Sequence, residues 1–294
     1  PLVTLDWQGG FLVADEREAQ VRSYSPEGRL LWYAGARGRG PGEFEAAKVL
    51  TRLRSGQVLA GDINGRLTVF DSAGKGVVRT VQAPIDFLQD VEVVDDSLVL
   101  MTGIRGGDAQ GPRIHLWNLR TDSIVRSFFT PLPNVLNPTL ARTANWTSVG
   151  LRGDTVAAVF AVSDSVYLYT LSGTPLATIP LPSRHFRRAG RESPPVSARS
   201  NPVTRAEWIG RFDYVADVNW RSDGELLVAY ISLNPAEALA RKWHLLEMTR
   251  TGRRVREIRD TPRLLAVDSR SDSLYFINPG SEVESEWAVA YLRD

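Results

Sequence analysis

The stretch GFLVADEREAQVRSYSPEGRLLWYAGARGRGPGEF, residues 10–44, decides the fold. Short apolar runs alternate in it with Gly, Pro, Ser and Asp, which favour turns between strands. Residues 56–80, GQVLAGDINGRLTVFDSAGKGVVRT, repeat the same order of strands and turns. Self-similarity of this kind predicts a repeat protein made of small β-sheets.

The same order returns more loosely four further times, and one more apolar strand precedes each unit. Several strands are apolar on both faces, as expected when small sheets stack against each other. We therefore predict an all-β fold, a six-bladed β-propeller of four-stranded antiparallel blades, as a single domain over residues 1–294. The blades are expected at about residues 1–44, 45–84, 85–131, 146–182, 213–260 and 262–294, with a long loop at 183–212. The last unit ends after its third strand, so the last blade is expected to lack one strand in this chain.

The composition excludes several classes of protein. Lys and Arg number 35 and Asp and Glu 34, so no global positive field favours nucleic acid. Cysteine is absent, which excludes disulfides, cysteine nucleophiles and thiolate metal sites. No apolar run approaches the roughly 18–20 residues of a membrane-spanning helix. The chain begins at Pro1 without a signal-like segment, so we expect a processed product from which a targeting segment has been removed.

Residues 10–15, 20–22, 26–28 and 38–44 resemble an NHL repeat. That repeat has a Val-Ala-Asp strand, an Arg-Val strand, a turn glycine and a Gly-x-Gly-Pro-Gly-x-Phe link to the next blade. The match is specific in the first blade and fair in the second, and later blades keep only the rhythm of strands and turns. The resemblance implies a bacterial exported six-bladed propeller. The wider group includes lactonases, strictosidine synthase-like proteins and an amidating lyase, so the fold does not choose between enzyme and binding protein.

The long insertions all fall between second and third strands or between blades, and the other turns are short. Recognition usually lies on long loops of a rigid scaffold. The basic loop 183–212 and nearby aromatic residues give candidate binding residues on this long-loop face: Arg184, His185, Phe186, Arg187, Arg188, Arg191, Trp146 and Trp208. The alternative is that the arginines pair with the protein's own carboxylates and the aromatic rings pack their own loop.

The sequence offers few candidates for catalysis. His115 and His244 occupy like positions in third strands, which favours structural roles over a zinc site. The resemblance to lactonases implies an axial calcium ion, for which the candidate ligands are Asp90, Glu92, Asp217 and Asn219. Carboxylates at strand ends also cap turns or pair with arginines. No catalytic residue set stands out, so we expect no enzyme activity and no cofactor, with Ca²⁺ at the propeller axis as the alternative.

These observations favour a non-catalytic binding or scaffold propeller. We expect a periplasmic or secreted accessory subunit that docks through its long-loop face on a protein partner or a membrane-anchored complex. Its attachment to the membrane would run through that partner or through a removed N-terminal segment. One alternative is a calcium-dependent lactonase or hydrolase acting at the axial pocket. A second alternative is a small-ligand or glycan receptor.

Overall fold

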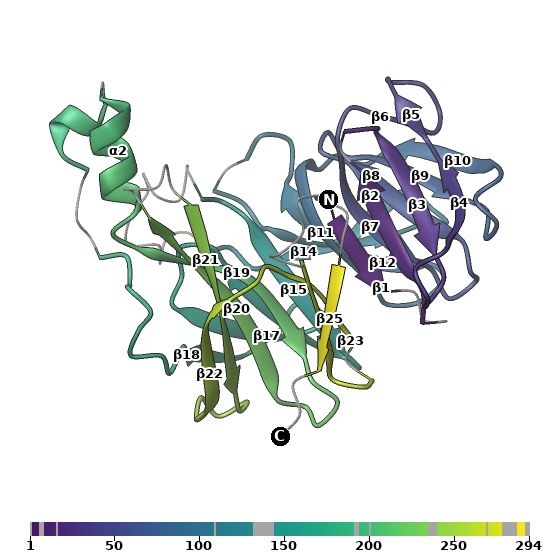
Figure 1. Cartoon of the computed structure of the whole chain (residues 1–294). Coiled ribbons are helices and arrows are strands. Elements are labelled where there is room, and N and C mark those ends of the chain that lie inside the picture. Colours follow the sequence, from purple (N-terminus) through teal and green to yellow (C-terminus); the bar gives the residue numbers. More distant parts are fainter. Residues whose placement is uncertain are drawn as a thin grey trace. The chain divides into compact units, whose positions relative to one another are not determined.

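A computed structural model shows short antiparallel strands joined by tight turns along most of the chain (Figure 1). The structure describes residues 2–5, 9–15, 17–108, 110–131, 144–190, 194–199, 201–234, 240–268, 270–277 and 287–291. The chain forms two units, Pro1–Thr130 and Pro131–Asp294, and each is described by itself.

The N-terminal unit contains three four-stranded antiparallel sheets, each with its strands in sequence order. The first consists of β1 (Leu2–Leu5), β2 (Phe11–Asp15), β3 (Gln20–Tyr24) and β4 (Leu30–Ala34). The second consists of β7 (Ala47–Arg52), β8 (Val58–Asp62), β9 (Arg66–Phe70) and β10 (Val77–Gln82). The third consists of β11 (Asp86–Val93), β12 (Leu98–Ile104), β13 (Ile114–Asn118) and β14 (Ser123–Phe128). A short parallel pair, β5 (Ala36–Arg37) and β6 (Glu43–Phe44), lies between the first two sheets in the sequence.

The C-terminal unit contains two four-stranded sheets, one three-stranded sheet and one described α-helix. The first sheet consists of β15 (Thr147–Arg152), β16 (Thr155–Phe160), β17 (Ser165–Thr170) and β18 (Pro175–Pro180). The second consists of β19 (Asp213–Trp220), β20 (Leu226–Asn234), β21 (Ala240–Met248) and β22 (Arg254–Thr261). The three-stranded sheet consists of β23 (Leu264–Asp268), β24 (Ser273–Ile277) and β25 (Trp287–Tyr291). The segment between β18 and β19 holds the 3₁₀ helix η1 (Val196–Arg199) and the α-helix α2 (Pro202–Ile209).

The blade count predicted from the sequence is wrong. In the described residues the structure has five four-stranded blades, not six, because the strands within residues 262–294 form a sheet of three. The predicted count of six takes each repeat unit of the sequence as a blade, and the last unit provides only three described strands.

The blades are held together by apolar side chains between neighbouring sheets. In the N-terminal unit, one cluster joins the first two sheets, with Leu12, Phe44 and Phe70 fully or almost fully buried. A second cluster, which includes Trp117 and Ile85, joins the second and third sheets. Inner strands such as β8 and β9 are therefore buried on both faces, as their apolar sequence runs predict.

Turns of neighbouring blades are also joined by hydrogen bonds. Ser55, in the turn between β7 and β8, donates its backbone N–H to Asp96 Oδ1 at 2.6 Å. In the C-terminal unit, Ser222 donates its backbone N–H to Asp272 Oδ1 at 2.8 Å in the same manner. In both cases the carboxylate comes from the turn between the first two strands of the next sheet. Each such turn is therefore fixed by a residue about 40 to 50 positions later in the chain.

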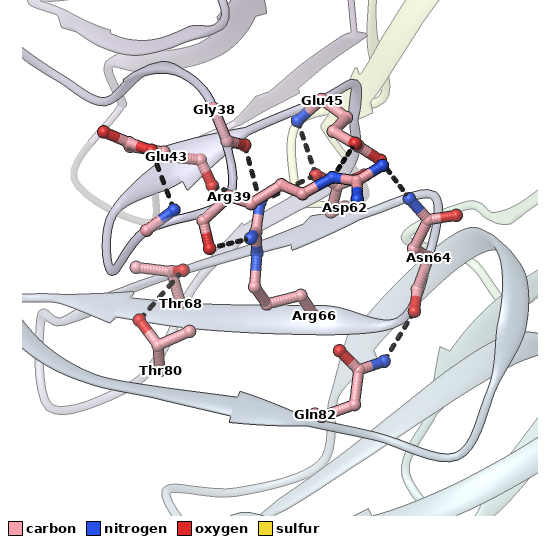
Figure 2. A network of polar contacts seen from close by, with 11 residues as sticks. Gly38, Arg39, Glu43, Glu45, Asp62, Asn64, Arg66, Thr68, Thr80 and Gln82 are labelled. Atoms are coloured by element: carbon pink, nitrogen blue, oxygen red, sulfur yellow. Dashed lines mark hydrogen bonds and ion pairs between the residues drawn. The ribbon is translucent and has the colours of Figure 1, made fainter.

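The link at residues 38–44 is held by Arg66 (Figure 2). The Arg66 guanidinium donates to the carbonyl oxygens of Gly38 at 3.0 Å and Glu43 at 2.7 Å. The same guanidinium lies 3.3 Å from Oδ2 of Asp62, a buried carboxylate. These bonds satisfy carbonyl groups that a loop without regular structure would otherwise leave to water.

His115 is buried in the third blade and gives a test of stability against pH. Its Nδ1 lies 2.8 Å from Ser127 Oγ on the adjacent strand. Burial lowers the pKa of His115 from 6.5 to about 4. The unfolded chain therefore binds a proton more readily than the folded chain between these two values, and stability rises with pH across this window.

We expect the free energy of unfolding to be about 2 kcal/mol lower at about pH 5 than at pH 7.5 because of His115 alone. Urea titrations of the whole chain at both pH values measure this difference. The variant His115→Gln has no group that titrates there, so its dependence on pH is expected to be flatter by that amount. Equal dependence in the two proteins would contradict the assignment.

Candidate functional site

The insertion between β18 and β19, residues 181–212, is the most elaborate described connection in the chain. The sequence analysis predicts a long loop here, whereas the structure has the helix α2, with Asn201 as its N-cap and Pro202 as its first residue. The Asn201 side chain accepts hydrogen bonds from the backbone N–H groups of Val203 at 2.9 Å and Thr204 at 3.3 Å. In Figure 1, α2 projects away from the strands of its own unit.

The start of the insertion is fixed to the fifth blade by Ser183. The Ser183 hydroxyl donates to Glu257 Oε1 at 2.5 Å and accepts the backbone N–H of Phe186 at 3.0 Å. Tyr230 donates its hydroxyl to the same carboxylate oxygen at 2.7 Å. Burial opposes ionisation of Glu257, but the hydrogen bonds from Ser183, Tyr230 and Arg254 outweigh it, so the pKa of Glu257 is lowered. An ionised carboxylate therefore anchors this end of the insertion.

Arg187 is fixed to Asp213 at the other end of the insertion. The Asp213 carboxylate is buried and accepts from the Arg187 backbone N–H at 2.9 Å and from its Nε at 2.8 Å. Arg187 Nη1 also donates to the carbonyl oxygen of Gly210 at 2.9 Å. The Arg187 side chain nevertheless remains 44% exposed. It is therefore both a structural clamp and a cation at the surface.

Arg188 has a similar but more exposed arrangement. Its Nε lies 2.8 Å from Asp164 Oδ2, and its Nη2 donates to the carbonyl oxygen of Leu181 at 3.1 Å. The side chains of Arg188 and Asp164 are 51% and 43% exposed. Water screens such an exposed pair, so it contributes little to stability while it still limits where the guanidinium can point.

The three candidate aromatic residues pack within the unit. Phe186 is 5% exposed and meets the Tyr230 ring edge-on at 5.4 Å between centroids. Trp208 is 2% exposed on the inner side of α2. Trp146 is half-buried and donates its indole N–H to the Val215 carbonyl oxygen at 2.7 Å. All three therefore hold the insertion and its surroundings together.

The exposed part of the insertion combines arginines with two valines. Arg184 and His185 are exposed, and Arg191 lies outside the described residues. Val196 and Val203 are 80% and 66% exposed, more than any other large apolar side chain that the structure describes. Sequence reasoning missed both valines, although each directly follows a proline in a polar stretch.

The four candidate calcium ligands are already hydrogen-bonded or lie in separate units. On β19, Asp217 accepts from Ser148 Oγ and, at 2.8 Å, from Asn219 Nδ2. Asp90 and Glu92 lie on β11 of the N-terminal unit. Within the described part of the chain, no three residues of His, Cys, Asp or Glu gather in an arrangement that would hold a metal ion.

A small pocket in the C-terminal unit bears on the small-ligand alternative. Its cavity volume is about 10 Å³, and it is lined by Arg221, Leu227, Glu247, Val267, Asp272 and Leu274. Arg221 lies 3.3 Å from Glu247 and 3.5 Å from Asp272, so the one cation of the lining pairs with both of its carboxylates. A cavity of roughly 10–15 Å³ holds about one water molecule, so this one is too small for an organic ligand.

No family model matches the chain, and no curated protein matches it in sequence. Solved structures do match the fold. A putative exported protein from Bacteroides fragilis has a TM-score of 0.60 at 11% identity, over 94% of this chain and 78% of that one. Virginiamycin B lyase from Staphylococcus aureus has a TM-score of 0.58 at 13% identity, over 93% and 75%. The WD40 repeats of RRP9 have a TM-score of 0.55 at 14% identity, over 93% and 71%.

These likenesses show that the chain has a β-propeller fold. At identities this low they establish no specific function, because enzymes and WD40 repeat proteins both occur among the similar structures. Among the described residues, no helix is long and apolar enough to cross a membrane.

Proposed function

We propose that the chain is a non-catalytic propeller that binds another protein through the insertion at residues 181–212. The observation that carries this proposal is the exposure of Val196 and Val203 on a segment that is otherwise firmly anchored. Exposed apolar side chains on a rigid support lose little conformational entropy when a partner covers them. Such a surface is therefore suited to binding rather than to solvation alone.

Charge indicates what kind of partner segment fits. The exposed charged residues of the described insertion are mostly basic, and they are Arg184, Arg187, Arg188, Arg205, Arg211 and Glu207. Two of these arginines are held in place by carboxylates and still reach solvent. Arginine in a fixed position binds carboxylates with good geometry. The proposed partner therefore presents an acidic segment that also carries apolar side chains.

The likeness to an exported protein supports an extracytoplasmic location for this propeller. A propeller that binds a protein without catalysing a reaction would act as an accessory or scaffold subunit. The membrane-anchored complex expected from the sequence is a suitable partner for it. The link at residues 38–44, which Arg66 holds by hydrogen bonds, supports the view that the first blade is of the NHL type.

The double variant Val196→Asp/Val203→Asp tests this function. Both positions are exposed and lie in the first turn of a short helical segment, Val196 in η1 and Val203 in α2, so the added carboxylates leave folding unchanged. We expect the variant to bind the partner at least about tenfold more weakly, because apolar burial is lost and the acidic segment is repelled. Quantitative capture from native membrane extracts, followed by titration with the purified partner, measures the change.

The matched control is Val125→Asp, which adds one carboxylate at a 56% exposed valine on β14 of the other unit. This control is expected to bind like the wild type. Equal capture by the double variant and the wild type would contradict the proposal, and so would recovery of the wild-type propeller with nothing bound.

A further inference from the structure

Strand β4 differs from the fourth strands of the other four blades in its composition. Its sequence, Leu-Leu-Trp-Tyr-Ala, contains neither a charged residue nor a proline. The other fourth strands each contain at least one: β10 has Arg79, β14 has Arg126, β18 has two prolines and β22 has several charges. Charges and prolines on an edge strand discourage pairing with another chain, and β4 has no such protection.

The edge of β4 is open. In the described residues it pairs with β3 on one side only, and it is the last strand of its sheet (Figure 1). The register between β3 and β4 contains a bulge, but all five pairs of third and fourth strands contain one. Because the other four blades have the bulge as well as charges or prolines, the bulge alone does not compensate for the lack of these residues in β4.

The exposed side chains of β4 are large and apolar. Leu30 is 52% exposed, Leu31 59% and Tyr33 61%, whereas Trp32 packs partly against the core between the first two blades. Trp32 therefore packs β4 against its own unit, while Leu30, Leu31 and Tyr33 form an exposed apolar row. Such a row on an open edge fits an extended β-strand, whose main chain would complete the hydrogen bonds of β4.

The charges at the two ends of β4 favour a second copy of the same strand. Glu27 and Arg29 lie between β3 and β4, and Arg37 lies in β5 just after β4, and all three are exposed. When two copies pair antiparallel about Trp32, Leu31 of one copy lies opposite Tyr33 of the other. The same arrangement places Glu27 of each copy opposite Arg37 of the other, while Arg29 lies opposite Gly35, which carries no charge. A parallel arrangement would instead bring like charges together.

We propose that this chain forms a symmetric dimer in which the β4 strands of two copies pair antiparallel at their open edges. The dimer closes on itself because each copy contributes the same edge, so no larger assembly follows from this contact. The Glu27 and Arg37 contacts set the direction of pairing, and Leu30, Leu31 and Tyr33 supply the apolar area. This inference does not depend on the proposed function of the insertion, which lies in the other unit.

Sedimentation velocity of the whole chain, from a few micromolar to several hundred micromolar, tests the proposal. The wild type is expected to pass from monomer to dimer with rising concentration. Leu31→Lys, which places a charge on the apolar row, is expected to raise the dissociation constant at least about tenfold. The matched control Val125→Lys, at a 56% exposed valine on the fourth strand β14, is expected to leave it unchanged.

A charge exchange separates specific pairing from non-specific adhesion. Glu27→Arg alone and Arg37→Glu alone each place like charges together and are expected to weaken the dimer. The double variant Glu27→Arg/Arg37→Glu restores opposite charges and is expected to recover it. Circular dichroism of each variant confirms that the sheets are intact.

Several results would overturn the proposal. One is a wild type that stays monomeric at the highest concentration, including the case in which β4 instead captures a different protein. A second is that Val125→Lys raises the dissociation constant as much as Leu31→Lys does. A third is that the double charge variant does not regain dimer formation. A fourth is that assemblies larger than the dimer form and persist in Leu31→Lys.

Discussion

Replacing Arg66 by alanine is expected to lower the free energy of unfolding of the N-terminal unit by about 3–5 kcal/mol. The Arg66 side chain is 15% exposed and the partner carboxylate of Asp62 is 1% exposed, so the variant leaves a charge buried without its counter-ion. It also removes the donors for the carbonyl oxygens of Gly38 and Glu43. Urea titration followed by circular dichroism and tryptophan fluorescence measures the loss.

Arg39→Ala is the matched control for Arg66→Ala. Arg39 comes from the same link and pairs with Glu45, but its side chain is 83% exposed. Solvent already screens this pair, so the expected loss of stability is small beside that of Arg66→Ala. If the two alanine variants lost similar stability, the assignment of Arg66 as the residue that holds the link would be wrong.

Replacing Asp213 by alanine is expected to cost about 2–4 kcal/mol in the C-terminal unit and to loosen the insertion. The variant removes the acceptor of the Arg187 backbone N–H and guanidinium in a buried position. Arg187 itself stays partly hydrated, so the expected cost lies below that of a fully buried pair. Tryptic cleavage after Arg187 or Arg188, followed by mass spectrometry, is expected to become several-fold faster than in the wild type.

Asp164→Ala provides the comparison for Asp213→Ala within the same insertion. It removes the partner of Arg188, and both side chains of that pair are about half exposed. We expect less than about 1 kcal/mol of destabilisation and little change in tryptic cleavage. Equal sensitivity of the two variants to trypsin would show that Asp213 does not hold the insertion in place.

The strands and their order could be predicted from the sequence because turns and apolar runs are local signals. The buried faces of β8 and β9 follow directly from their apolar composition. The count of six blades is wrong because it takes every repeat unit as a blade. The last unit ends after its third strand in the sequence, and its described strands form a sheet of three.

The candidate binding residues show a similar division. The excess of arginine in the 183–212 loop indicates an insertion with a basic surface, but the sequence does not show which arginines pair within the chain. Arg187 binds a carboxylate 26 positions away, a distance over which sequence patterns carry no information. Phe186 and Trp208 resemble exposed anchors by composition, and only the packing of the fifth blade and α2 shows them to be buried.

The hydrogen bonds between the turns of successive blades have a consequence for synthesis on the ribosome. Ser55 can form its hydrogen bond only after Asp96 has been synthesised, and Ser222 only after Asp272. The link before the second blade likewise requires Arg66. In these three places, a part of the fold is completed by residues that are translated after it. When one sheet has just emerged from the ribosome, its turn still lacks the hydrogen-bond partner that the next sheet provides. Stalled or truncated translation products are thus expected to expose their last sheet to chaperones and proteases.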